Sequence, residues 1–188
     1  MDFKITSTKP GACKSQAGFT LIETLFTVGI TTLCLAALTT FTVFSTHSFA
    51  TLYNYVDLDD SNRIAIDQLT RDVRQANAVT SFTTNQLTLQ DSDGLALTWA
   101  FDSTNRTLTR IKEGSSSTLV LRECEHLVFD VRQRNVVGGT YDVYPLATNA
   151  ATAKVVNVYW TCSRKVLGRR EDTESVQTAR IVIRKQGT

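Results

Sequence analysis

The chain has 188 residues, which leaves room for one membrane anchor and one folded domain of about 100 to 150 residues. Its net charge is only +2, and residues 1–18 supply it, because they hold three lysines against one aspartate. The remaining residues are balanced at 17 basic and 17 acidic, since the whole chain has 20 and 18. Without a basic excess we do not expect a nucleic-acid partner.

Residues 24–56 contain no Asp, Glu, Lys or Arg. A helix needs about 20 apolar residues to cross a hydrocarbon core of about 30 Å, so this stretch is long enough for a membrane span. One acid, Glu23, stands at its N-terminal edge. Three lysines precede the run and three aspartates follow it: Lys4, Lys9, Lys14, Asp57, Asp59 and Asp60. This asymmetry predicts a cytoplasmic N-terminus and an extracytoplasmic remainder.

Two ordinary export signals do not fit the order of these residues. Ser48-Phe49-Ala50 has the small-x-small form of a signal-peptidase site, but the apolar core before it is too long for a secretory signal. Gly11-Ala12-Cys13 looks like a lipidation site, yet it precedes the apolar run instead of following it. We therefore expect cleavage on the cytoplasmic side, before the run.

The ten residues Lys14-Ser15-Gln16-Ala17-Gly18-Phe19-Thr20-Leu21-Ile22-Glu23 resemble the processing signal of prepilins. That family comprises type IV pilins, their minor subunits and the pseudopilins of type II secretion. The resemblance implies that a prepilin peptidase cuts between Gly18 and Phe19 and methylates the new N-terminus. It also implies that Glu23 recruits each subunit into a filament.

Further partners and a location follow from the same resemblance. The implied partners are the prepilin peptidase/N-methyltransferase, other pilin or pseudopilin subunits, an inner-membrane assembly platform and membrane lipid. The implied location is the bacterial cytoplasmic membrane, crossed once, and then a pilus or pseudopilus.

Physical chemistry leaves two roles open for Glu23. A charge at the centre of a span costs about 2 to 3 kcal/mol, and less near the edge, so such a residue usually has a partner. The amine of Phe19, freed by cleavage, lies about 6 Å away along one helix, and the amine of a neighbouring subunit is an alternative. In the other role, Glu23 simply extends into the headgroup region.

We predict one long helix from about residue 19 to about residue 78. No proline occurs between Pro10 and Pro145, so none interrupts it. Residues 19–44 form its transmembrane half, in which threonine hydroxyls can bond to carbonyls of the preceding turn. Residues 45–79 form an amphipathic half that packs on the domain. Its apolar residues recur mainly at spacings of three and four: Leu52, Val56, Ile66, Leu69 and Val73.

The period changes near residue 80, and residues 80–188 are expected to form an antiparallel β domain. Residues 95–101 and 155–162 alternate between apolar and polar side chains, which is typical of half-buried strands. Shorter strands are expected near residues 85–89, 107–111, 119–124, 127–132 and 177–185. The fold class is therefore α+β and pilin-like, with one antiparallel sheet or two small ones on the second half of the helix. The element order is similar to that of minor pilins and J-type pseudopilins.

Few residues of the domain suggest chemistry. Cys124 and Cys162 are a candidate disulfide in an oxidising compartment, or else two separate buried thiols. His126 is expected on the same strand face as Cys124. Asp91 and Asp93 precede Gly94 as in a calcium loop, but a plain turn fits better because a strand follows. The aromatic residues Trp99, Phe101, Tyr159 and Trp160 are expected in the core. We expect no metal, no cofactor and no enzymatic activity.

Two functional hypotheses remain. The first is a structural subunit, a minor pilin or pseudopilin, which is processed by prepilin peptidase and assembled through its N-terminal helix. The alternative is a membrane-anchored extracytoplasmic binding module that does not polymerise. The sequence does not distinguish an adhesion pilus from a DNA-uptake or secretion machine.

Overall fold

The computed structural model describes residues 18–135, 143–165 and 174–184. The segment before the expected cleavage point, up to residue 17, and the end of the strand expected near residues 177–185 lie outside these residues. The elements are α1 (Leu21–Gln75), β1 (Ala78–Phe82), β2 (Gln86–Gln90), β3 (Ala96–Asp102), β4 (Thr107–Lys112), β5 (Thr118–Leu121), β6 (Cys124–Gln133), η1 (Ala150–Thr152), β7 (Ala153–Ser163) and β8 (Glu174–Val182). The chain divides into two units, residues 1–46 and 47–188, which are described separately.

In the first unit, α1 is apolar all round, and residues 21–44 are all exposed. Its threonine hydroxyls bond to carbonyls three or four residues earlier, as expected. Thr31 Oγ1, for example, donates to the Thr27 carbonyl at 2.6 Å, and Thr40 Oγ1 donates to the Ala36 carbonyl at 2.8 Å. These bonds satisfy the hydroxyls within the helix, so they impose no need for an external polar partner.

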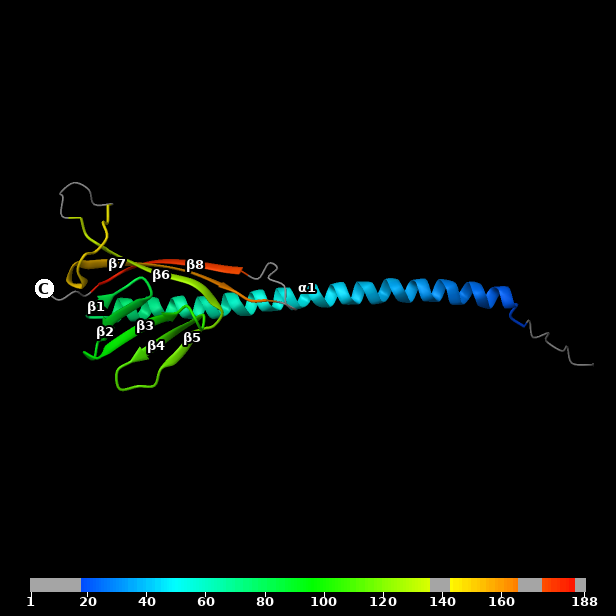
Figure 1. The fold of residues 1–188 in the computed structure, drawn as a ribbon, viewed down its shortest axis with the longest axis horizontal. Coiled ribbons are helices and arrows are strands. Elements are labelled where there is room, and N and C mark those ends of the chain that lie inside the picture. Colours follow the sequence, from blue (N-terminus) through cyan, green and yellow to red (C-terminus); the bar gives the residue numbers. More distant parts are fainter. Residues whose placement is uncertain (1–17, 136–142, 166–173, 185–188) are drawn as a thin grey trace, which may run out of the picture. The chain divides into compact units, whose positions relative to one another are not determined.

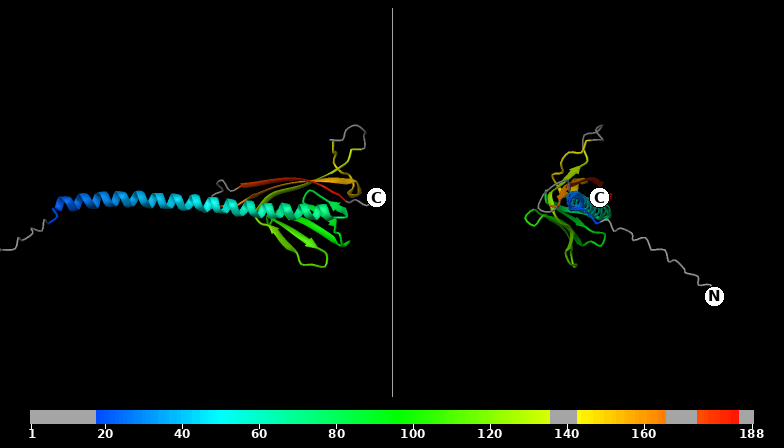
Figure 2. Two further views of the ribbon diagram at one scale, coloured as in Figure 1. Left: turned by 180° about the vertical axis from the view of Figure 1, so that it is seen from behind. Right: turned by 90° about the vertical axis from the view of Figure 1, so that its right-hand side faces the viewer.

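The second unit is an α+β domain built from the rest of α1 and two antiparallel sheets (Figures 1 and 2). The five-stranded sheet has the order β1-β2-β3-β4-β5, and the three-stranded sheet has the order β6-β7-β8. The chain thus has a long apolar N-terminal helix followed by antiparallel sheets, which confirms the expected pilin-like fold class. Of the two alternatives, two small sheets are present.

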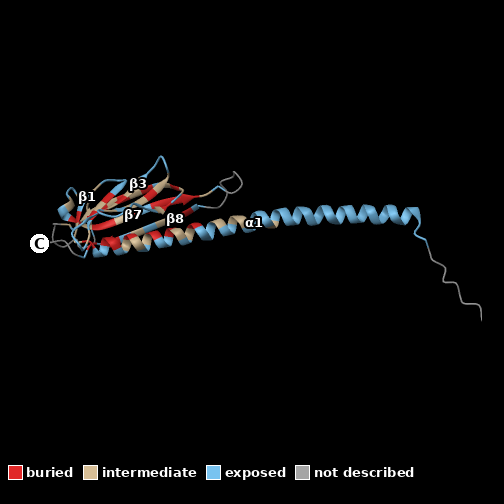
Figure 3. Cartoon of the chain, turned by 90° about the horizontal axis from the view of Figure 1, so that it is seen from below, coloured by how far each residue is buried: buried red, intermediate tan, exposed pale blue. Residues whose placement is uncertain are grey.

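The face of α1 that packs on the sheets is a regular stripe at spacings of four and three. Figure 3 shows that the buried residues of α1 lie only in the half of the helix that packs on the sheets. The stripe consists of Leu58, Asn62, Ala65, Leu69, Asp72 and Val73, and the buried Ala76 follows directly after the helix. Leu52 and Val56, expected on this face, are instead 60% and 50% exposed. The buried stripe therefore begins at Leu58, later than the apolar pattern predicts, and it includes two polar residues, Asn62 and Asp72.

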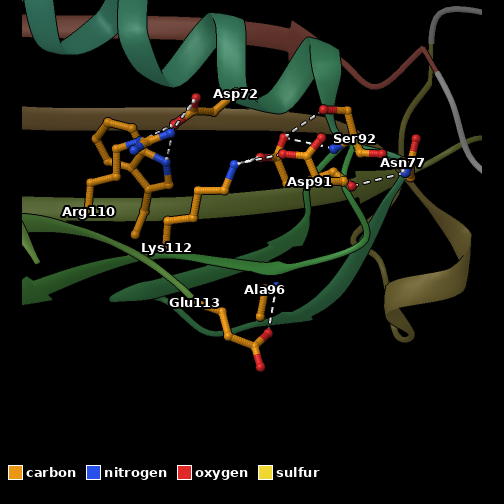
Figure 4. Close-up of polar contacts among 10 residues, drawn as sticks. Asp72, Asn77, Asp91, Ser92, Ala96, Arg110, Lys112 and Glu113 are labelled. Carbon is orange, nitrogen blue, oxygen red and sulfur yellow. Dashed lines mark hydrogen bonds and ion pairs between the residues drawn. The ribbon is translucent and has the colours of Figure 1, made fainter. Parts of the chain in front are cut away.

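Each of these two polar side chains accepts a hydrogen bond from a buried tryptophan. The indole nitrogen of Trp160 on β7 donates to Asn62 Oδ1 at 3.0 Å, and that of Trp99 on β3 donates to Asp72 Oδ2 at 3.1 Å. Arg110 on β4 also binds Asp72, with Nε 2.7 Å from Oδ2 (Figure 4). The helix is thereby fixed to each sheet by a directional contact as well as by apolar packing.

The helix ends at Gln75, short of the expected boundary, and β1 begins at Ala78. Two sheet contacts account for the ending. The Asn77 backbone N–H donates to the Gln90 carbonyl at 2.8 Å, and its side-chain amide donates to the Asp91 carbonyl at 3.0 Å. These bonds draw the chain into the five-stranded sheet before another helical turn can form.

Asp91 and Asp93 lie in the turn between β2 and β3, and Lys112 forms an ion pair with each of them. Figure 4 shows Lys112 pointing toward Asp91. The Lys112 ammonium is 2.5 Å from Asp91 Oδ2 and 3.1 Å from Asp93 Oδ2. Gly94 completes the turn with a φ of 81°, which favours glycine. An internal cation therefore balances one of the two negative charges, which agrees with a plain turn.

His126 does not share the face of Cys124. The pairing of β6 with β7 shifts between these two residues, so that Glu125 is an extra residue in the ladder. This bulge reverses the alternation: Cys124 is fully buried, whereas His126 is exposed and contacts the ring of Tyr159 edge-on. Trp99 and Trp160 are fully buried as expected, but Tyr159 is 40% exposed.

Candidate processing and assembly site

The first candidate site is the start of α1, where Thr20 caps the helix. The Thr20 carbonyl accepts the N–H groups of Glu23 at 3.0 Å and of Thr24 at 3.2 Å. Its hydroxyl oxygen also lies 3.4 Å from the Glu23 nitrogen. Thr20 and Glu23 thus occupy the first and last positions of a Ser/Thr-x-x-Glu capping pattern. Sequence reasoning missed this role of Thr20, although the spacing was visible.

Glu23 lies in the first turn of α1, where a carboxylate interacts favourably with the helix dipole. Its side chain is exposed, and within the described parts of the chain it makes no hydrogen bond or ion pair. It is also the only charged residue between Gly18 and Asp57. A single carboxylate on an otherwise apolar surface therefore remains available to a cation outside this chain.

The two residues at the expected cleavage point precede the helix. Phe19 is 76% exposed, and a Cβ added to Gly18 would have no heavy atom within 4 Å. Neither residue is held by packing in the folded chain. Any requirement for glycine at position 18 must therefore come from a molecule that binds this segment.

The surface that follows is apolar and exposed. Helix α1 is the one described helix long and apolar enough to cross a membrane, and no residue of its most apolar stretch is buried. The large exposed side chains of its first part are Leu21, Ile22, Leu25, Phe26, Val28, Ile30, Leu33, Leu35, Leu38, Phe41, Val43 and Phe44. Such a surface is stable only in lipid or against other apolar helices.

The other candidate residues, Cys124 and Cys162, lie in the second unit. They face each other on β6 and β7, both are fully buried, and both are free thiols. Among the described residues, no group of three or more His, Cys, Asp or Glu side chains could hold a metal ion.

Comparison with known families supports the assignment of the N-terminal segment. Residues 13–39 match the family described as the prokaryotic N-terminal methylation motif. The match includes the expected cleavage point, Thr20, Glu23 and the first part of α1. No curated protein matches the chain.

The motif and the apolar helix together indicate a prepilin-type, membrane-anchored protein that is processed by a prepilin peptidase. The motif covers only the N-terminal segment, so it says nothing of the β domain or of the machine to which the protein belongs.

Proposed function

We propose that this protein is a structural subunit, a minor pilin or pseudopilin, of a type IV pilus or a type II secretion pseudopilus. Cleavage occurs between Gly18 and Phe19, and the new amine of Phe19 is methylated. One observation carries this proposal: a methylation motif runs into a helix that exposes a predominantly apolar surface and one carboxylate in its first turn.

The apolar half of α1 acts first as an anchor and then as an assembly element. In the membrane, lipid surrounds the exposed side chains of residues 21–44. In the filament, the same side chains pack against helices of other subunits, and small residues such as Gly29 permit close approach. Because lipid and a helix bundle are similarly apolar, transfer between them costs little hydrophobic energy.

Glu23 supplies the specificity that apolar packing lacks. A carboxylate moved into a helix bundle needs a cation, and the methylated amine of Phe19 on a neighbouring subunit is one of matching charge. Pairing across subunits favours one axial stagger of the helices over all others. The assembly role of Glu23 is thus to set the register, while the apolar surface supplies the affinity.

The orientation of the chain follows from its charges. Lysines of the leader keep the N-terminus in the cytoplasm, and the β domain then lies outside the cytoplasmic membrane. The partners in this scheme are the prepilin peptidase, other pilin-type subunits, the inner-membrane assembly platform and lipid.

Intact-mass spectrometry of the membrane-extracted protein tests the proposal, combined with immunodetection in a sheared-filament or pseudopilus fraction. We expect a mature chain that begins at methylated Phe19 and co-purifies with the filament fraction. An intact Met1, or a processed chain that never enters that fraction, would contradict the proposal. Either result would favour a membrane-anchored binding module that does not polymerise.

A further inference from the structure

Cys124 and Cys162 occupy directly opposed positions on neighbouring antiparallel strands. The backbone bonds around them define the type of pair. The Ser163 N–H donates to the Glu123 carbonyl at 3.0 Å, whereas the Cys124 N–H donates away from β7, to the Arg106 carbonyl at 3.0 Å. The two cysteines therefore form a non-hydrogen-bonded pair, in which opposing Cα atoms are about 4.5 Å apart. That separation falls at the short end of the range that disulfides span.

The two side chains occupy the same buried site. Both residues are 0% exposed, and Sγ of Cys124 donates a hydrogen bond to the His126 carbonyl at 3.5 Å. In the folded domain, the proximity of the two side chains lowers the pKa of the Cys124 thiol and, together with burial, raises the pKa of the Cys162 thiol.

We propose that Cys124 and Cys162 are oxidised to a disulfide that joins β6 to β7. The inference rests on the proposed function in one respect, because an extracytoplasmic location supplies the oxidising environment. The oxidant is a protein or small-molecule disulfide of that compartment.

The reaction proceeds by two thiol–disulfide exchanges. The thiolate of one cysteine attacks one sulfur of the oxidant, forming a mixed disulfide and releasing the other sulfur as a thiol. The thiolate of the second cysteine then attacks Sγ of the first, forming the intramolecular bond and releasing the second thiol. The two cysteines lose two protons and two electrons in total, and the disulfide of the oxidant gains them.

Burial determines when this reaction occurs. Neither sulfur is accessible in the folded domain, so oxidation takes place while β6 and β7 are still coming together. Once the core has closed, the same burial protects the bond from reductants. The disulfide is therefore a stable structural bond.

The position of the pair gives the bond a mechanical consequence. The residues that flank it, Glu123 and Arg164, form an ion pair at 2.6 Å. Arg164 also reaches α1, with Nη1 2.8 Å from Asp57 Oδ2 and 3.2 Å from Asn54 Oδ1. A disulfide between positions 124 and 162 would hold together the strand ends that bind this part of the helix. It would keep that attachment intact when the filament is under load.

Counting free thiols in the full chain tests the inference. The protein is extracted from membranes, denatured, alkylated without reductant and weighed intact. The chain from Phe19 onward contains three cysteines, Cys34, Cys124 and Cys162. We expect one alkyl group without reductant, on Cys34, and three after reduction. Three groups without reductant would overturn the inference. The Cys34→Ser variant is the matched control, and we expect it to carry no alkyl group before reduction and two after reduction.

The same spectrum separates this inference from the proposed function. A chain that begins at methylated Phe19 but carries three free thiols contradicts only the disulfide. A chain that retains Met1 contradicts only the processing, whatever its thiol state. The two failures are therefore visible as different masses.

Refolding provides a second measurement that does not depend on the cell. The reduced full chain is refolded from urea into detergent micelles with a mixture of reduced and oxidised glutathione. We expect the intramolecular 124–162 bond to form and to raise the Tm by about 10 °C relative to the reduced chain. If only mixed disulfides with glutathione form, the opposed geometry is wrong. The Cys124→Ala variant should show neither the bond nor the rise in Tm.

Discussion

The indole nitrogen of Trp160 lies 3.0 Å from Oδ1 of Asn62, and both residues are fully buried. They are 98 positions apart in the chain, so the bond joins the helix to the three-stranded sheet. The amide nitrogen of Asn62 is buried without a partner among the described residues. The tryptophan bond therefore offsets part of the cost of placing this amide in the core.

Trp160→Phe should destabilise the domain by about 1 to 3 kcal/mol, because it leaves the Asn62 carbonyl oxygen buried without a donor. The free energy of unfolding is measured by urea denaturation of the full chain in detergent. The control is the double variant Trp160→Phe/Asn62→Leu. Since both polar partners are then absent, we expect it to recover most of the loss. A double variant that is less stable than Trp160→Phe alone would contradict this account.

The same pair shows where reading the sequence succeeds and where it fails. Alternation placed Val156, Val158, Trp160 and Cys162 on one face, and all four are buried. The helix pattern missed Asn62 and Asp72, which are polar residues on a buried face. Each of these two polar side chains is stabilised in its buried position by a hydrogen bond from a tryptophan far along the chain. Local periodicity contains no information about such a distant partner. The N-terminal methylation motif was easier to recognise because its residues lie within ten consecutive positions.

Stability of the turn between β2 and β3 should depend on pH through Asp91 and Lys112. The hydrogen bond from Lys112 lowers the pKa of Asp91 below its ordinary value of 3.8. The stability gained is therefore present above pH 3.8 and is lost as the pH falls through the lower folded pKa. Conversely, the bond to Asp91 raises the pKa of Lys112 above 10.5. That contribution is present below pH 10.5 and is lost as the pH rises through the higher folded pKa.

We therefore expect a plateau of stability between about pH 4 and pH 10, with a decline on either side. Asp91→Asn should make the acid decline shallower when Tm is measured against pH. The matched control is Asp93→Asn, because the Asp93 side chain is 65% exposed and its ion pair is worth little. Equal acid dependence of the wild type and Asp91→Asn would refute the argument.

Gly18→Val should block processing without disturbing the folded chain. Position 18 has open space around it, since a Cβ added there has no heavy atom of the described residues within 4 Å. A peptidase that binds this segment closely would reject the added bulk. Because residues 1–18 are a tenth of a 20.8-kDa chain, the uncut form should migrate about 2 kDa heavier.

Gly29→Ala is the matched control for that variant. Gly29 is also open, but it lies inside α1 and away from the expected cleavage point. It should be cut as efficiently as the wild type in a membrane-fraction immunoblot. Normal processing of Gly18→Val would show that the bond after residue 18 is not the one cleaved.

Glu23 has two local roles that substitutions can separate. It occupies the third position of the capping pattern that begins at Thr20, and it carries the only charge of the apolar run. Glu23→Gln keeps a side chain that suits the third position of a capping box but removes the charge. If Glu23 pairs with a methylated amine in the filament, Gln and Ala variants should lose incorporation to a similar degree, about tenfold or more for a partly buried pair. Incorporation is measured as the ratio of filament-associated to membrane-associated protein.

Thr20→Ala supplies the comparison, because it removes the cap, worth about 1 kcal/mol, and leaves the carboxylate in place. We expect it to be inserted and assembled nearly as well as the wild type. If Glu23→Gln assembles normally while Thr20→Ala does not, the start of α1 matters for its helical structure and the charge does not. The methylated amine would then need another counterion in the filament, and register would have to be set elsewhere along the helix.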